Sequence, residues 1–235
     1  MSFLKAEWRK LALANYEVDP NILKPYLPAK TELDTWSDTH YVSLVGFMFV
    51  NTKMLGIRIP FHVNFEEVNL RFYVRYQDQN EWKRGVVFIK EIVPKPAITF
   101  VANTLYNEHY VTHKMGHLWE DKTDYKRVTY EWVTKGKLQS FSVETAVEAI
   151  PIEVGSEAEF ITEHYWGYTK VNERKTFEYE VTHPRWDVYP VKKQEINVDY
   201  GLVYGDDFKF LNQLQPKSVM LAEGSEISVE NKRTI

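Results

Sequence analysis

The sequence has no cysteine among its 235 residues. This absence excludes disulfides, thiolate zinc sites, iron–sulfur clusters and cysteine nucleophiles, and it favours a cytoplasmic location. Long apolar runs are also missing, because the longest, residues 41–50, has only the length of a strand. Charged residues begin at Lys5, too early for the apolar core of a signal peptide. We therefore predict a cytoplasmic protein with no membrane partner.

An excess of positive charge is missing as well. The 29 Lys and Arg residues stand against 33 Asp and Glu residues, which gives a net charge of −4. Nucleic-acid binding relies on neutralising phosphates, so a nucleic acid is not an expected partner. The sequence contains no glycine-rich phosphate loop, no Gly-x-Ser-x-Gly motif and no His-Glu-x-x-His motif. We expect no cofactor and no structural metal, and the oligomeric state stays open.

Aromatic residues are abundant at 15% of the chain, and they favour strands. No Pro-, Gly- or Ser-rich linker divides the chain, so we predict a single domain over residues 1–235. Short helices are predicted at residues 20–27, 98–105 and 158–165, with a further turn at 208–214. About nine or ten strands, one of them over residues 196–203, fill the rest. This pattern predicts a mainly β (α+β) fold, built as a closed or nearly closed antiparallel β-barrel.

One long strand is predicted to have a polar face. Over residues 61–76 apolar and polar side chains alternate, but the apolar positions are odd-numbered before Glu66 and even-numbered after Glu67. This change of phase predicts a β-bulge at Glu66-Glu67. A turn at residues 78–80 joins the strand to residues 86–93 as a hairpin. The polar face carries Glu67, Asn69, Arg71, Tyr73 and Arg75. It is either a solvated strand face or the wall of a ligand cavity, in which Arg71 would bind a carboxylate.

A second candidate region, residues 108–114, combines two histidines with an acid, a phenol and an amine. If it is a strand, His109 and His113 point to one side and Tyr110 and Lys114 to the other. The histidines would need a third ligand from elsewhere to bind a metal, so we interpret them as partly exposed side chains. Lys114 would act as a nucleophilic amine only if it were desolvated, because burial lowers the pKa of a lysine.

Several motifs resemble those of one family. Phe65-Glu66-Glu67-Val68-Asn69-Leu70-Arg71, followed by Gly85-Val86-Val87-Phe88 and later by Phe160-Ile161-Thr162-Glu163-His164, is similar to the YqjF-like family DUF2071. The resemblance spans roughly residues 10–190. It implies the fold of acetoacetate decarboxylase, a β-barrel whose cavity holds a small β-keto acid and whose lysine forms a Schiff base. Glu67 falls where that enzyme carries an active-site glutamate. The paired lysines of the enzyme are replaced by Tyr110 and Val111, so decarboxylase activity is not expected.

The sequence supports three functional hypotheses. We favour a soluble β-barrel protein whose cavity binds a small anionic or carbonyl-bearing organic molecule. Its ligand-binding residues would be Glu67, Asn69, Arg71, Tyr73, His109 and Tyr110. The alternative is an enzyme acting on a keto or enol substrate by acid–base or Schiff-base chemistry, with Lys114, Glu67 and Tyr110 as catalytic candidates. The third is a structural or interaction protein whose barrel is filled by aromatic side chains.

Overall fold

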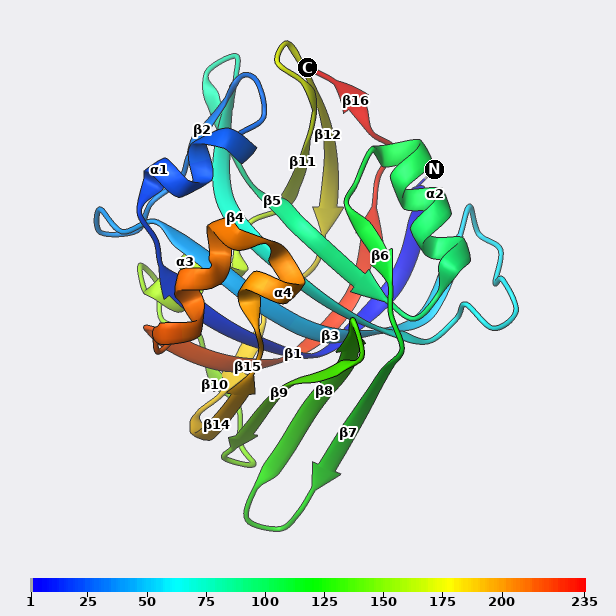
Figure 1. Cartoon of the computed structure of the whole chain (residues 1–235). Helices are drawn as coiled ribbons and strands as arrows, with labels where there is room; N and C mark the ends of the chain where they lie inside the picture. The colour runs from blue at the N-terminus through cyan, green and yellow to red at the C-terminus, as the bar shows by residue number, and fades with distance from the viewer. Residues whose placement is uncertain (1) are drawn as a thin grey trace.

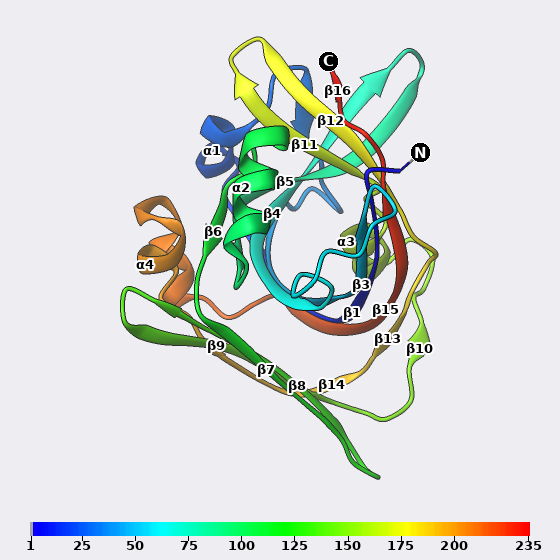
Figure 2. The same ribbon diagram turned by 90° about the vertical axis from the view of Figure 1, so that its right-hand side faces the viewer.

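Long strands form the main sheet, which closes on itself as a ring (Figures 1 and 2). The structure, a computed structural model, describes residues 2–235. The long strands are β1 (Leu4–Glu17), β3 (Tyr41–Met54), β4 (Phe65–Asp78), β5 (Glu81–Val93), β11 (Trp166–Asn172), β12 (Lys175–Thr182) and β15 (Ser218–Val229). Short strands extend this sheet: β2 (Thr31–Leu33), β6 (Tyr110–Thr112), β10 (Ile150–Pro151), β13 (Asp187–Tyr189) and β16 (Arg233–Thr234). Neighbours follow the order β15-β1-β3-β4-β5-β11-β12, and β12 pairs with β15, which completes the ring.

Most neighbouring strands of the ring are antiparallel, but β5 pairs in parallel with β6 and with β11. The helix α2 (Pro96–Tyr106) follows β5 and carries the chain back along the sheet. Tyr110 at the start of β6 therefore lies opposite Glu91, and both strands run in the same direction. The mainly β fold with a few short helices is confirmed, and its ring is antiparallel except at these two contacts.

The alternating side chains of β4 face two different environments. The even-numbered apolar residues from Val68 to Val74 are fully buried outside the ring. Phe65, Glu67 and Arg71 instead point into the ring, where they line a cavity. The polar face that the sequence predicts is therefore the inner face of this strand, and the apolar face packs against the rest of the protein.

The bulge that we predicted at Glu66-Glu67 is wrong. Glu66 pairs with Met48 and Glu67 with Phe47 in an unbroken ladder between β3 and β4. Residues 61–63 lie before the start of β4, in a turn and loop. Their alternation is therefore not part of the strand pattern, and the change of phase marks the entry into the strand rather than a bulge within it.

A second sheet covers one outer side of the ring (Figure 2). It consists of β14 (Val191–Asn197), β9 (Lys137–Thr145), β8 (Lys126–Thr134) and β7 (Met115–Asp121), in this order. Tyr130 of β8 packs closely on Gly46 of β3, where a Cβ atom would lie 2.7 Å from the tyrosine ring. The Tyr130 hydroxyl donates to the carbonyl of Lys10 at 2.7 Å. Burial of Trp132 and Phe141 in the same layer holds the second sheet against the ring.

The helices begin and end at residues that the sequence identifies as caps. They are α1 (Pro20–Leu23), the 3-10 helix η1 (Lys24–Tyr26), α2, α3 (Glu157–Thr162), α4 (Tyr200–Tyr204) and the 3-10 helix η2 (Asp206–Gln213). Asp19 caps α1 and Ser156 caps α3, each by accepting a backbone N–H with its side chain. Asn107 ends α2 in the left-handed conformation, at φ 59°.

The strand predicted over residues 196–203 is wrong beyond Asn197, because Asp199 caps a helix there and accepts the N–H of Leu202. Two of the other helices position the site: α2 lies at one end of the ring and α3 at the opposite end (Figure 2). No helix within residues 2–235 is long and apolar enough to cross a membrane.

Candidate functional site

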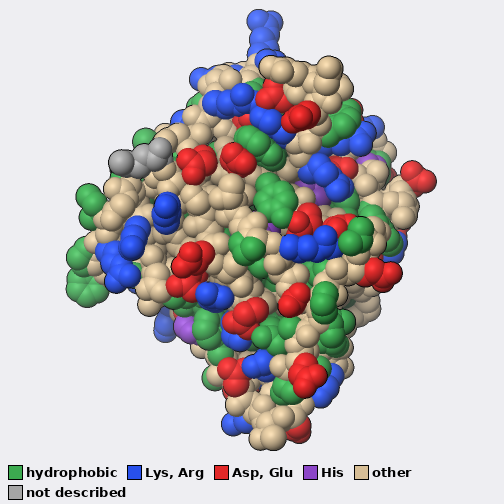
Figure 3. Space-filling view, turned by 180° about the vertical axis from the view of Figure 1, so that it is seen from behind, with side chains coloured by type: hydrophobic (Ala, Val, Ile, Leu, Met, Phe, Trp, Pro, Cys, Tyr) green, Lys and Arg blue, Asp and Glu red, His purple; other side chains and the backbone are tan. Residues whose placement is uncertain are grey.

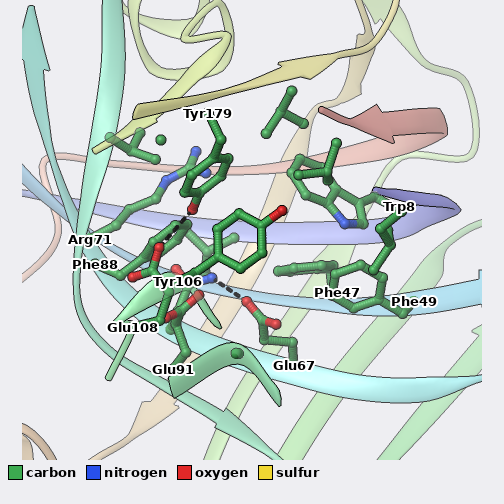
Figure 4. A pocket seen from close by; sticks show the side chains of 18 of the residues that line it. Trp8, Phe47, Phe49, Glu67, Arg71, Phe88, Glu91, Tyr106, Glu108 and Tyr179 are labelled. Carbon is green, nitrogen blue, oxygen red and sulfur yellow. Dashed lines mark hydrogen bonds between the residues drawn. The ribbon is translucent and has the colours of Figure 1, made fainter. Parts of the chain in front are cut away.

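A cavity of about 130 Å³ lies inside the ring (Figure 4). Most of its wall is apolar and comes from aromatic side chains of β1, β3 and β4, namely Trp8, Phe47, Phe49 and Phe65. One side of α2 also contributes, through Ile98, Val101, Ala102 and Tyr106. The interior is thus hollow, which contradicts the hypothesis of a ring filled by aromatic side chains.

Three buried glutamates line this cavity. Glu67 comes from β4 and Glu91 from β5, and Glu108 follows α2 just before β6. Glu67 accepts hydrogen bonds from Asn69 Nδ2 and from the Tyr110 hydroxyl, both at 2.9 Å. Burying a carboxyl group without such partners would cost several kcal/mol. These contacts explain how Glu67 is held in an otherwise apolar interior.

Glu108 is held by groups from the opposite wall. Its Oε1 accepts the hydroxyl of Thr169 at 2.6 Å and the hydroxyl of Tyr179 at 3.0 Å. Figure 4 shows Glu91 between Glu67 and Glu108. The Oε2 atom of Glu91 is buried and has no hydrogen-bond partner within the described residues. The cluster therefore keeps an oxygen available to a molecule that enters the cavity.

Burial makes this cluster hold protons near neutral pH. Desolvation raises the pKa of Glu67 to about 7, although the hydrogen bonds from Asn69 and Tyr110 oppose the shift. It also raises the pKa of Glu108 to about 7, against the hydrogen bonds from Thr169 and Tyr179. The pKa of Glu91 is raised well above its usual value by burial, and further by the nearby carboxyls of Glu108 and Glu67. A protonated carboxyl can donate a hydrogen bond to a ligand oxygen.

Arg71 supplies a cation to the same cavity. Its guanidinium carbon lies 5.7 Å from the centre of the Tyr73 ring, and Nη2 makes a long hydrogen bond of 3.4 Å to the carbonyl of Ile161. Its Nε is buried and has no partner within residues 2–235. Because a guanidinium has five N–H donors in a fixed fork, most of the donor capacity of Arg71 stays available.

The structure brings together four of the residues that the sequence predicts: Glu67, Asn69, Arg71 and Tyr110 all line the cavity. Tyr73 is packed inside the ring beside the cavity, against Phe160 and His164, and its hydroxyl shares a hydrogen bond of 2.7 Å with Ser43. His109 is exposed and borders a second hollow, which shares the lining residues Phe88 and Glu108 with the cavity. Neither Tyr73 nor His109 therefore lines the cavity.

Lys114 is exposed and lines neither hollow. The burial that would activate its amine is missing, so the condition for its catalytic role is not met. The reason is local, because only residues 110–112 form a strand and the chain leaves the ring after them. No lysine of the described residues lines the cavity. The part of the chain that the structure describes also contains no group of three His, Cys, Asp or Glu side chains suited to a metal.

Sequence reasoning missed Glu91, Glu108 and Tyr179. Glu91 pairs with Asn69 and so points to the same face, but only because the register shifts between Leu70 and Arg71; a regular hairpin would pair Asn69 with Lys90, so the sequence held no signal for Glu91. Glu108 lies outside any strand and Tyr179 comes from a distant one, so only closure of the ring brings them to the site.

A ring-shaped sheet around such a cavity defines the class of acetoacetate decarboxylase-like folds, and solved structures share it. Acetoacetate decarboxylase from Legionella pneumophila superposes with a TM-score of 0.67 at 12% identity, over 99% of this chain and 86% of that one. The enduracididine biosynthesis enzyme MppR complexed with pyruvate gives a TM-score of 0.71 at 11% identity, over 100% and 91%. At such low identity the likeness concerns the fold alone.

The chain belongs to the DUF2071 family, described as an uncharacterized conserved protein, whose profile matches residues 5–226. A curated relative is the uncharacterized protein YqjF of Bacillus subtilis strain 168. It is 27% identical over 192 residues, which are 78% of this chain and 74% of the relative. The family resemblance that the sequence motifs suggest is therefore confirmed.

Proposed function

We propose that the cavity binds a small organic acid that also carries a carbonyl group. The carboxylate of the ligand would bind Arg71, and its carbonyl oxygen would accept a hydrogen bond from the protonated carboxyl cluster. One observation carries the proposal: Arg71 Nε and Glu91 Oε2, both buried and both without a partner within the described residues, line the same cavity. Unsatisfied buried polar atoms are costly, and a ligand with matching groups would relieve that cost.

The size and charge of the cavity limit the ligand. A cavity near 130 Å³ is of the order that holds a benzene-sized molecule, so the ligand has few heavy atoms. A single guanidinium faces glutamates that favour their neutral form, which suits a monoanion. The pyruvate complex of MppR supports the proposal, since a protein of this fold can hold a small 2-oxo acid.

Titration calorimetry with pyruvate, 2-oxobutanoate and acetoacetate tests this proposal. Arg71→Leu is expected to weaken binding by roughly ten- to a hundred-fold, because it removes a charge-assisted hydrogen bond worth about 1.5–3 kcal/mol. Arg75→Leu is the matched control, since Arg75 lies on the same strand but pairs with Glu32 at the surface. Equal loss in both variants, or no binding of any of the three acids, would contradict the proposal.

A second candidate function is acid–base catalysis on the bound ketone, and the contact between Tyr110 and Glu67 favours it. A carboxyl whose pKa is raised to about 7 can accept and return a proton near neutral pH. Ionised Glu67 would remove a proton from the carbon beside the carbonyl while the protonated carboxyl of Glu91 gives its proton to the carbonyl oxygen, which forms the enol; the reverse transfers restore the ketone and both carboxyl groups. The Schiff-base route lacks support, because no lysine among the described residues lines the cavity.

Exchange of ligand protons for deuterium, followed by NMR in heavy water, tests this activity. Glu67→Gln should abolish protein-dependent exchange, because an amide cannot act as the base, while the ligand still binds through Arg71. Exchange no faster than in buffer, or unchanged exchange in Glu67→Gln, would rule out this second function and leave the binding proposal intact.

A further inference from the structure

The loop between β3 and β4 exposes large apolar side chains at one end of the ring. Leu55 is 55% exposed, Ile57 68% and Phe61 87%. We call residues 53–61 the apolar hairpin. Side chains of this size are normally packed, because exposing them forgoes the free energy of burying their apolar surface. Three in one short loop therefore point to a partner that covers them.

The backbone of the apolar hairpin is held in an unusual conformation. Met54 and Ile57 exchange two backbone hydrogen bonds of 2.9 Å, which closes a two-residue turn at Leu55 and Gly56. Both turn residues have positive φ, 49° and 82°, and Phe61 has a φ of 65°. Asparagine and glycine adopt this region most easily, whereas bulky residues are disfavoured there. Leu55 and Phe61 thus occupy positions where local stability alone would favour a small polar residue.

Helix α2 also exposes apolar side chains at this end of the ring. Its Phe100 is 70% exposed and Leu105 is 45% exposed. The N–H of Leu55 donates to the carbonyl of Phe3 at 2.9 Å, and the Phe3 ring lies 4.9 Å from the ring of Tyr106 at the end of α2. Figure 2 shows α2 and the loop at the same end of the ring. Both elements therefore carry exposed apolar side chains at this end of the ring.

Basic side chains accompany this surface. Lys53 and Arg58 lie in the apolar hairpin, and Lys5 pairs with Lys53 in the β1–β3 register. Residues 51–64 contain no Asp or Glu, although the whole chain has a net charge of −4. The carboxylates at the base of the loop are engaged, Glu7 by Arg9 at 2.6 Å and Glu66 by His117 at 2.7 Å. Figure 3 shows hydrophobic and basic side chains protruding together at the left-hand edge of the molecule.

The positive charge of this surface distinguishes between two possible partners, a second copy of the chain and an anionic lipid bilayer. A symmetric contact with a second copy would bring two net-basic surfaces together, because both copies of a two-fold interface use the same surface. Like charges would then repel. A partner that is apolar inside and anionic at its surface fits both the exposed side chains and the basic ones, and an anionic lipid bilayer has that structure.

We propose that this end of the ring docks on anionic lipid bilayers. Leu55, Ile57 and Phe61 insert at the boundary between headgroups and acyl chains, and Lys53 and Arg58 contact the lipid phosphates. Such a peripheral contact needs no membrane-spanning segment, so it departs from our expectation of no membrane partner without conflicting with the lack of long apolar runs. It also does not depend on the ligand that we propose for the cavity.

Co-sedimentation of the full chain with phosphatidylcholine vesicles, with and without phosphatidylglycerol, tests this contact. The wild-type protein should bind the anionic vesicles, and binding should fall as salt is added. Leu55→Asn/Phe61→Asn should reduce binding at least about ten-fold, because two inserted side chains are lost. Asparagine tolerates positive φ, so this variant should fold. Lys53→Glu/Arg58→Glu should remove the preference for phosphatidylglycerol.

The matched control is Leu138→Asn/Val154→Asn, which changes two exposed apolar side chains outside this surface and should bind like wild type. Three outcomes would overturn the proposal. The wild-type protein does not bind anionic vesicles, or the control variant loses binding equally. Alternatively, sedimentation equilibrium shows a dimer that Leu55→Asn/Phe61→Asn dissociates, in which case a second copy covers the surface.

Discussion

At the scale of single residues, one glycine determines how the site is assembled. Gly167 of β11 lies opposite Tyr179 of β12, and a Cβ atom at Gly167 would be 2.2 Å from Cζ of that ring. The tyrosine ring therefore lies flat on the backbone of the neighbouring strand. This placement directs its hydroxyl to Glu108 at 3.0 Å, so the polarity of the cavity depends on the absence of a side chain at position 167.

Gly167→Ala should consequently disturb both packing and the carboxyl cluster. We expect a loss of about 1–3 kcal/mol, the usual cost of overpacking a well-filled site, because the Tyr179 ring must move. For a chain of this size each kcal/mol lowers Tm by about 2–4 °C. Thermal unfolding followed by circular dichroism measures the effect. Gly116→Ala is the control, since no atom lies within 4 Å of a Cβ at that position. Similar Tm values for both variants would show that Tyr179 is not held in this way.

At the scale of elements, the sequence predicts what depends on near neighbours along the chain. Asp19, Ser156 and Asn107 mark helix ends correctly, because a cap acts within a few residues. The inner face of β4 follows from its two-residue period. The hairpin of β4 and β5 follows from its turn, at which Gln79 adopts positive φ.

Errors at this scale arise where the pattern is not specific to strands. Residues 61–63 alternate like a strand but form a turn and loop before β4, which produced the incorrect bulge. The apolar pattern of residues 198–203 fits either a buried strand or a short helix, and the cap at Asp199 decides for the helix. Exposure of Lys114 depends on how the chain leaves the ring, which no local pattern records.

At the scale of the whole molecule, ring closure buries carboxyl groups and a histidine, and burial shifts their pKa values in opposite directions. Burial raises the pKa values of Glu67 and Glu108 to about 7. It lowers the pKa of His164 to about 4, although the hydrogen bond to Asp34 opposes that shift. Neutral carboxyls stabilise the folded chain fully below pH 4.5, and this contribution is lost as the pH rises towards 7. Neutral His164 contributes above pH 6.5, and its contribution is lost as the pH falls towards 4.

Removing the two carboxyl groups should therefore move the pH of maximum stability upwards. In Glu67→Gln/Glu108→Gln the two carboxyl groups whose ionisation destabilises the fold as the pH rises from 4.5 to 7 are absent. The protonation of His164, which destabilises the fold as the pH falls towards 4, remains. Relative to wild type, the double variant should gain stability by a few kcal/mol between about pH 5 and about pH 8. Urea unfolding across this range measures the gain.

The same substitutions at the exposed Glu81 and Glu153 should give no such pH-dependent gain. If the double variant and wild type keep a constant difference at every pH, then Glu67 and Glu108 are ionised in the folded protein throughout. In that case the cluster could not donate a hydrogen bond to a ligand carbonyl, and Arg71 alone would have to bind the acid.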